Sequence, residues 1–392
     1  MTRKLFLSAF LASSLFTLTS SYDGNAQSLS AKEAEKLSHA LIKERQERSV
    51  KEYGAEWENR ELKNGEYTMK FFYKFFGEEP EDGRSMYISM HGGGGTQASV
   101  NERAWENHKK LNKPNEGLYF VPRSPTNAWN MWHQEYMDGF IEKAIELAVI
   151  YEGVNPNKVY VMGYSAGGDG TFQLAPRLAD LWAAAAMSAG HPGDAQIESL
   201  RNLPFGLYMG GQDAAYKRND HARKWKVKLD SLANVDKGGY IHDVHIFEEF
   251  GHQMKRSDSI SVDWMDDFTR NAIPNKVVWV QDNIIRDKFY WLEATEDGKK
   301  QHQKIVATYS EGRVDILEAT TASFIIGLND KMMNLNKKVA IFYKGEEIFN
   351  GKVVRSENNI KDDVNKMRDL DLIFPAKIKI KIANNKAVVE NI

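Results

Sequence analysis

The residues best suited to chemistry lie in one short stretch, where an apolar run from Val159 leads into the sequence Gly163-Tyr164-Ser165-Ala166-Gly167. A serine hydroxyl at a sharp turn between a strand and a helix projects above the sheet, where it can attack an electrophile. Such a turn has no room for side chains beside the serine, so Gly163 and Gly167 are expected on steric grounds. The five letters alone also fit an ordinary glycine-rich turn. Their position between a strand and a helical segment favours Ser165 as a nucleophile.

A second glycine-rich stretch, His91-Gly92-Gly93-Gly94-Gly95, follows the apolar run Met86–Met90. Acyl transfer produces an oxyanion that needs two amide donors at about 2.7–3.1 Å, and glycines let bare backbone approach that closely. We expect Gly93 and Gly94 to supply one donor and Ala166, after the nucleophile, to supply the other. A phosphate-binding loop is the alternative, but the stretch lacks the Gly-Lys-Ser/Thr ending of such loops.

A serine nucleophile requires a base, and the base requires a carboxylate that orients it. His252 follows the run Val244–Phe247 at the carboxyl end of the last expected strand, where such sheets carry function, and we predict it to be the base. Asp213 follows the strand-like run Phe205–Met209 and a glycine turn, and we predict it to be the acid. This gives the chain order Ser, Asp, His. Weaker candidates for the acid are Asp220, Asp243, Glu248 and Glu249.

The remaining histidines receive other expectations. His91 is expected to brace the glycine loop, and His242 and His245 to face the sides of a strand or solvent. Four lie in polar segments and are expected at the surface: His39, His108, His221 and His302.

An aromatic-rich loop from Arg123 to His133 is expected to overhang the nucleophile. Trp129 and Trp132 can stack on a sugar or an aromatic acyl group, and Arg123 or His133 can hold a polar substituent. Packing of the domain explains the two tryptophans equally well. A second loop contributes His191 as a further candidate for substrate binding.

The elements that must position these residues alternate regularly along the chain. After a helical segment within residues 27–66, strand-like runs alternate with helical patterns over residues 67–274. The expected strand-like runs are 67–76, 86–90, 118–121, 159–162, 183–187, 205–209 and 244–247. This alternation predicts an α/β fold with a mostly parallel, doubly wound sheet. Residues 275–392 read instead as short β runs separated by turns, and predict a C-terminal, antiparallel, sandwich-like all-β domain. The expected runs there are 277–280, 289–292, 305–308, 324–327, 339–343 and 378–382.

Composition narrows the function classes. The 392 residues are 42% hydrophobic, enough for a substantial core, and 52 basic against 54 acidic residues leave a net charge of −2. No long block of one sign is present, so nucleic acid is not an expected partner. The absence of cysteine excludes disulfides, thiolate metal sites and a cysteine nucleophile. The expected chemistry needs neither a metal nor a cofactor.

Residues 1–26 have the features of a cleavable export signal. Arg3 and Lys4 precede an apolar run from Leu5 to Leu18, and small residues stand near Ala26. The run is shorter than the ~20 residues that span a bilayer, which disfavours a membrane anchor. We therefore expect a secreted or periplasmic product with no membrane span after signal removal.

With these motifs in place, the segment from about Tyr67 to Ala272 resembles the α/β-hydrolase superfamily, and within it secreted esterases of the polyhydroxybutyrate-depolymerase and feruloyl-esterase group. The resemblance implies an α/β-hydrolase fold, a Ser-His-Asp triad, and hydrolysis of carboxylic esters through an acyl-enzyme, with an acylated polysaccharide or a polyester as candidate substrate. These relatives often carry cysteines near the oxyanion loop and this chain has none, which weakens the transfer of their substrate. The alternatives are a serine peptidase that cleaves aminoacyl amides, and an extracellular glycan-binding protein with a vestigial hydrolase domain.

Overall fold

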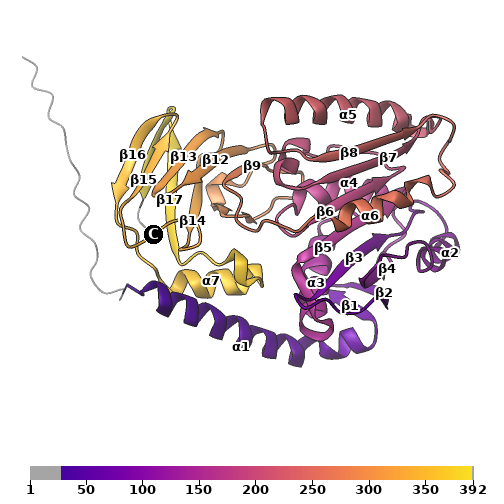
Figure 1. Cartoon of the computed structure of the whole chain (residues 1–392), viewed down its shortest axis with the longest axis horizontal. Helices are drawn as coiled ribbons and strands as arrows, with labels where there is room; N and C mark the ends of the chain where they lie inside the picture. The colour runs from indigo at the N-terminus through magenta and orange to yellow at the C-terminus, as the bar shows by residue number, and fades with distance from the viewer. Residues whose placement is uncertain (1–27, 391–392) are drawn as a thin grey trace, which may run out of the picture.

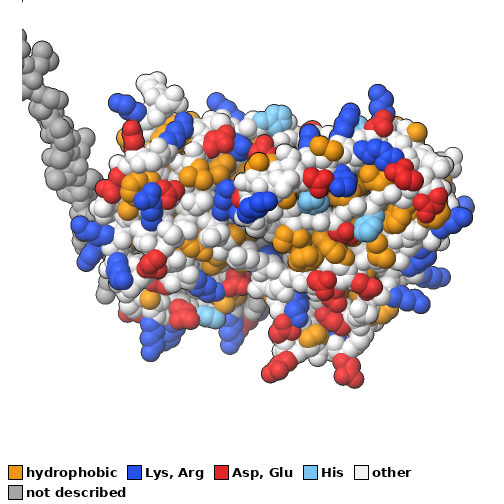
Figure 2. Space-filling view, turned by 45° about the horizontal axis from the view of Figure 1, so that its top comes forward, with side chains coloured by type: hydrophobic (Ala, Val, Ile, Leu, Met, Phe, Trp, Pro, Cys, Tyr) orange, Lys and Arg blue, Asp and Glu red, His pale blue; other side chains and the backbone are white. Residues whose placement is uncertain are grey.

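The computed structural model describes residues 28–390, so the expected export signal lies outside the described residues. A large α/β region is followed by a smaller β-rich region, and one long helix lies along both (Figure 1). Within residues 28–390, no helix combines the length and the apolar character needed to cross a bilayer. On the face shown in Figure 2, acidic and basic side chains are interspersed and the hydrophobic ones form several separate patches.

An eight-stranded sheet forms the centre of the large region, in the order β1-β2-β4-β3-β5-β6-β7-β8. Strand β2 pairs antiparallel with β1 and β4, and the other neighbours pair parallel. The strands are β1 (Glu61–Asn64), β2 (Tyr67–Phe76), β3 (Arg84–Met90), β4 (Gly117–Pro122), β5 (Val154–Tyr164), β6 (Ala184–Ser188), β7 (Phe205–Gly210) and β8 (His242–Phe247). All but β1 overlap a run expected from the sequence.

Helices cover both faces of this sheet. They are α2 (Ala98–His108), α3 (Tyr136–Glu152), α4 (Ala166–Arg177), α5 (Arg218–Val235) and α6 (Ile260–Asp266), with the 3-10 turns η1 (Ile197–Asn202), η2 (Ala215–Lys217) and η3 (Ser257–Ser259). Successive residues of a strand point to opposite faces. Ile88 of β3 therefore joins the core cluster that contains α3, α4 and α5, while the adjacent Tyr87 joins the cluster that contains α2 and α6. This two-sided burial is what the near-continuous apolar strands predict.

The C-terminal region contains two five-stranded sheets, and most of their buried apolar side chains belong to one hydrophobic cluster. One sheet has the order β10-β11-β14-β17-β18, from strands β10 (Lys288–Phe289), β11 (Leu292–Ala294), β14 (Ser323–Leu328), β17 (Ala376–Ala383) and β18 (Lys386–Glu390). The other has the order β16-β15-β13-β12-β9, from β9 (Lys276–Val280), β12 (Lys304–Ser310), β13 (Arg313–Ala319), β15 (Val339–Tyr343) and β16 (Glu346–Gly351).

The structure corrects the expected C-terminal region in three respects. It is not all-β, because helix α7 (Glu357–Met367) and the turns η4 (Glu296–Gly298) and η5 (Leu370–Leu372) belong to it. It is not purely antiparallel, since β13 pairs parallel with β15. The expected strand 289–292 is instead a tight hairpin in which Phe289 pairs with Leu292. An apolar run of only four residues is too short to show a periodicity that would distinguish a strand from such a turn.

Helix α1 (Ala31–Glu58) connects the two regions (Figure 1). It starts at a capping box in which Ser30 and Glu33 each bond the other's backbone amide. Near its start, Ala34 and Ile42 pack with residues of α7 and the following segment. Near its end, Trp57 is buried against the aromatic side chains of the large sheet.

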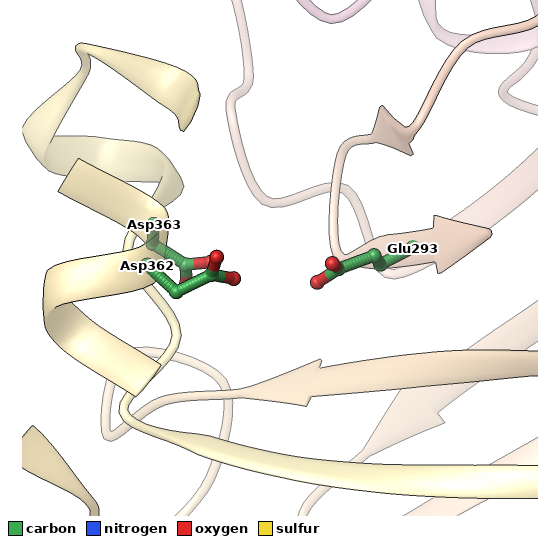
Figure 3. A group of neighbouring side chains, drawn as sticks. All are labelled: Glu293, Asp362 and Asp363. Carbon is green, nitrogen blue, oxygen red and sulfur yellow. The ribbon is translucent and has the colours of Figure 1, made fainter. Parts of the chain in front are cut away.

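Three carboxylates of the C-terminal region lie close enough together to suggest a metal site. Glu293 on β11 points toward Asp362 and Asp363 on α7, with oxygens within 4.8 Å of one another (Figure 3). Lysine ammonium groups already occupy this position: the Lys377 Nζ lies 2.7–3.0 Å from all three carboxylates, and Lys288 bonds Asp363. Although burial opposes its charge, these carboxylates raise the pKa of Lys377 above its ordinary value. The cluster is therefore an ion-pair network that joins α7 to the sheet.

The Lys377→Met variant is expected to lose about 3 kcal/mol of unfolding free energy, because it removes a cation that contacts all three carboxylates and leaves Lys288 and Lys366 to balance their negative charges. Urea unfolding followed by circular dichroism measures the loss. Lys331→Met, which removes an ion pair of a largely exposed lysine with Asp371, is the matched control and is expected to cost at most about 1 kcal/mol. Equal effects of the two substitutions would contradict this account of the cluster.

Candidate active site

The turn between β5 and α4 holds Ser165 in a backbone conformation that non-glycine residues rarely adopt, with φ 58° and ψ −119°. The Ser165 amide donates to the carbonyl of Ser188 on β6 at 2.9 Å. A Cβ at Gly163 would lie 2.1 Å from the Gly167 oxygen, and one at Gly167 would lie 2.0 Å from the Met90 oxygen. Only glycine fits at either position, which is the steric requirement that the sequence motif implies.

Ser165, His252 and Asp213 come together at the carboxyl edge of the sheet. The Ser165 Oγ lies 2.9 Å from Nε2 of His252, and Nδ1 of the same ring lies 2.7 Å from Oδ2 of Asp213. Because the carboxylate only accepts, we assign the ring proton to Nδ1, which leaves Nε2 free to accept the serine proton. The sequence prediction for the order and partners of these three side chains agrees with this geometry.

Neighbouring groups fix the imidazole and its carboxylate. The Asp213 side chain is only 2% exposed, whereas that of His252 is 38% exposed on the side open to solvent. Tyr164, directly before the serine, donates its hydroxyl hydrogen bond to the backbone oxygen of His252. The Arg218 guanidinium lies 3.9 Å from Asp213 and balances its charge.

The other carboxylates considered for the acid are engaged elsewhere. Asp243 accepts from the Tyr208 hydroxyl at 2.7 Å and pairs with His245, while Glu248 forms an exposed ion pair with Arg223. Asp220 and Glu249 are exposed.

The glycine loop after β3 lies against the serine. A Cβ at Gly92 would lie 3.2 Å from Cβ of Ser165. Gly94 does not offer a free donor, because its amide donates to Oδ1 of Asn101 at 2.7 Å. The prediction of Gly94 as an oxyanion donor is therefore wrong. The amides of Gly93 and Ala166 have no acceptor within the described part of the chain, so both are free to donate to a ligand.

His91 braces the glycine loop, as the sequence predicts. Its Nδ1 donates to the Gly92 oxygen at 2.7 Å, and its Nε2 accepts from the Ser124 amide at 3.2 Å. Burial lowers the pKa of His91 to about 4, so the ring is neutral near pH 7 and can play both roles. The Trp132 indole donates to the His91 backbone oxygen at 2.8 Å.

Two hollows lie in this part of the molecule, and Ser165 lines one of them. The Tyr164 hollow, of about 540 Å³, contains Ser165 and His252 and has Val100, Leu111 and Met254 on its apolar wall. Lys255 and Arg256 also line this hollow. It is wide enough for an acyl group beside the nucleophile.

The Trp129 hollow, of about 570 Å³, is lined by Trp129, His133 and His191, all three predicted to bind substrate. Two other predicted binding residues do not reach either hollow. Trp132 is fully buried and supports the glycine loop, so packing rather than stacking explains it. Arg123 donates to Ser124, Asn127 and Glu102 and therefore shapes its own loop.

Sequence reasoning missed or misplaced three residues that support or line the candidate site. Asn101, fully buried on α2, holds Gly94 and donates to Asn127 at 2.9 Å. His108 was expected at the surface, but it is buried, with Nε2 2.9 Å from Oγ of Ser89, and it lines the Tyr164 hollow. Tyr164 holds the base through its backbone. Helical spacing on α2 places Asn101, Trp105 and His108 on one face, and this is the signal that could have identified His108 as buried.

Searches against family models and against curated proteins find no match. Among solved structures, the chain is similar to a thermostable esterase, with 18% identity and a TM-score of 0.42 over 54% of this chain and 62% of that one, less than two thirds of its length. It is also similar to a fluorophosphonate-binding serine hydrolase from Staphylococcus aureus, with 12% identity and a TM-score of 0.37 over 53% and 96%. A Bacillus cereus carboxylesterase shows 15% identity and a TM-score of 0.36 over 50% and 93%.

Burial of His108 makes the stability of the fold sensitive to acid. Burial lowers its pKa to about 3, against about 6.5 in an unfolded chain. Between these two pH values the unfolded state binds a proton at His108 that the folded state does not. The unfolding free energy is therefore highest above pH 6.5 and decreases as the pH falls below it. From pH 7 to pH 5, the wild type is expected to lose about 2 kcal/mol more than His108→Gln, measured by urea unfolding. The exposed His39→Gln variant should follow the wild type, and a wild-type profile parallel to that of His108→Gln would refute the assignment.

Proposed function

We propose that the protein is a serine hydrolase of the α/β-hydrolase kind that cleaves carboxylic esters. The observation that carries the proposal is the hydrogen-bonded chain from Ser165 through His252 to Asp213, next to the free amides of Gly93 and Ala166. This arrangement combines an activated nucleophile with donors for the oxyanion, which are the two requirements of acyl transfer.

In the proposed mechanism, Ser165 Oγ attacks the ester carbonyl while His252 Nε2 accepts the hydroxyl proton. The carbonyl electron pair moves to the oxygen, which the two amides stabilise. Collapse of this intermediate breaks the bond to the alcohol, and His252 returns its proton to the leaving oxygen. Water then attacks the acyl-enzyme by the same route, and Asp213 keeps the imidazole in the required tautomer and orientation.

An acylated polysaccharide or a polyester is the candidate substrate, and a secreted or periplasmic location follows from the expected signal at residues 1–26. A serine peptidase would use the same three side chains. Two substrates that carry the same aminoacyl group, one as an amide and the other as a p-nitrophenyl ester, distinguish peptidase activity from esterase activity. A glycan-binding protein with a vestigial hydrolase domain would have no need to keep the three side chains within hydrogen-bond distance.

Replacement of Ser165 by Ala is expected to lower ester hydrolysis by about 10³-fold or more, since it removes the attacking atom. A series of p-nitrophenyl esters from acetyl to hydroxybutyryl and feruloyl measures the rates, and a fluorophosphonate probe with mass spectrometry locates the labelled residue. Ser231→Ala, an exposed serine on α5, is the control. Labelling at another residue, or full activity without the Ser165 hydroxyl, would exclude the proposal.

The Asn101→Ala variant tests whether the glycine loop is held for catalysis. Loss of the Oδ1 acceptor frees the Gly94 amide and removes the contact with Asn127, which should displace the neighbouring Gly93 donor. We expect kcat to fall by roughly 10- to 100-fold, the effect of a small misplacement, with a smaller change in KM. Arg103→Ala on the exposed face of the same helix is the control. Wild-type kcat in a folded Asn101→Ala protein would contradict this role.

A further inference from the structure

The segment that follows the candidate base brings two adjacent cations to the Tyr164 hollow. Lys255 and Arg256 lie three and four residues after His252, and both line the hollow together with Ser165. A chain extends by at most about 3.6 Å per residue, so their Cα atoms lie within about 11 and 14 Å of the Cα atom of His252. Both side chains are therefore near enough to contact a substrate whose ester bond lies at Ser165.

Neither cation is balanced by a neighbouring residue. Over residues 28–390, neither Lys255 nor Arg256 forms an ion pair or a side-chain hydrogen bond. The Lys255 Nζ lies 5.7 Å from the ring centre of Phe250, a contact that leaves its charge uncompensated. By contrast, Arg218 in the same site has Asp213 beside it. Both cationic residues are exposed, so a ligand can reach their head groups.

The backbone does not explain why these two positions carry cations. Lys255 and Arg256 have φ values of 47° and 68°, in the left-handed region where glycine and asparagine are the usual residues. The preceding Met254 is 1% exposed, and its carbonyl accepts from the Ser257 amide at 2.9 Å. A turn anchored by a buried side chain thus holds the two residues in the wall of the hollow, although the conformation itself disfavours long side chains.

The remaining lining groups leave the hollow positively charged. Asp258 is the single carboxylate among the described residues that line it. Burial raises the pKa of Asp258, and the charge of Arg256 acts in the opposite direction. His108 is neutral near pH 7, because burial lowers its pKa to about 3. Two cations therefore face one carboxylate, and this imbalance favours a negatively charged ligand.

The shape and chemistry of the lining indicate which anion fits. Val100, Leu111 and Met254 provide an apolar wall that suits a short hydrocarbon chain. A guanidinium group matches the geometry of a carboxylate, and an ammonium group adds a second charged donor. A hydrocarbon chain that ends in a carboxylate satisfies both parts of the hollow, whereas a neutral chain leaves both cations without a partner.

We propose that the substrate carries a carboxylate in addition to its ester group, and that Lys255 and Arg256 bind this carboxylate in the Tyr164 hollow. The inference rests on the proposed ester hydrolysis and specifies its substrate class. The two cations determine specificity and take no part in the bond changes at Ser165. The carboxylate belongs either to the acid part of the ester, as in a half-ester of a dicarboxylic acid, or to the alcohol part, as in an acylated hydroxy acid. Both sources present the same anion.

The test compares each charged ester with a neutral ester of the same shape, using the full chain. One series contains the methyl half-esters of succinic, glutaric and adipic acids, and the other the acetyl esters of glycolic, β-hydroxypropionic and γ-hydroxybutyric acids. Each compound is paired with the amide in which CONH₂ replaces the carboxylate. We expect kcat/KM for the preferred carboxylate to exceed that for its amide by about 10-fold or more. High salt should reduce this ratio, because ions screen exposed charges.

The Lys255→Gln/Arg256→Gln double variant should bring the carboxylate-to-amide ratio close to one, and each single variant should lower it by about 3-fold. Because the ratio compares two substrates on one protein, a general loss of activity cancels. The matched control is Lys337→Gln/Lys344→Gln, which removes the same charge from exposed positions of the C-terminal region. Lys344 also has a positive φ, of 49°. This control should leave the ratio unchanged.

A preference in the half-ester series would place the carboxylate in the acid part of the substrate, and one in the acetyl series would place it in the alcohol part. Three results would overturn the inference while Ser165-dependent cleavage of p-nitrophenyl esters stands. They are equal rates for carboxylate and amide or no cleavage at all in both series, a preference that the double variant retains, and an equal loss of preference in the control. Failure to cleave any p-nitrophenyl ester would instead refute the proposed function.

Discussion

The left-handed backbone at Ser165 is the constraint on which the candidate site depends. Residues other than glycine adopt such a conformation at a cost of about 1–3 kcal/mol, so the surrounding fold must enforce it. Here β3, β5 and α4 approach so closely that neither Gly163 nor Gly167 can carry a side chain, and the Ser188 carbonyl holds the serine amide. The tight turn between β5 and α4 thereby presents the Ser165 hydroxyl to the His252 imidazole.

The glycine loop is fixed by a different means, since it has no regular secondary structure of its own. Neutral side chains hold it from both sides: His91 binds the next carbonyl, and Asn101 takes up the amide of Gly94. Donors set in place before the reaction need no reorganisation when negative charge appears, which is the main source of oxyanion stabilisation. The same bonds select which amides remain available, so that Gly93 is free and Gly94 is not.

The sequence predicted what depends on local pattern and missed what depends on packing. The strands that precede Ser165 and Asp213 are apolar runs bounded by glycine turns, and the fold places both residues as chain order suggests. By contrast, the roles of Asn101 and Trp132 depend on which loop packs against each side chain. The spacing of nearby residues in the sequence does not predict this packing. The strands of the C-terminal region were harder to predict, because strands such as β13 and β16 alternate polar and apolar residues only weakly. The tight hairpin at Phe289 also resembles a single strand in the sequence.

Helix α1 has a consequence for how the molecule holds together. At about 1.5 Å per residue, its 28 residues extend for roughly 42 Å. Its first half shares apolar contacts with α7 and its second half with the large sheet, while one continuous hydrophobic cluster contains side chains of both regions. Truncation at the boundary near residue 275 would expose apolar side chains of the large region that this cluster buries. The two regions are therefore expected to melt in a single cooperative step, and not as independent modules.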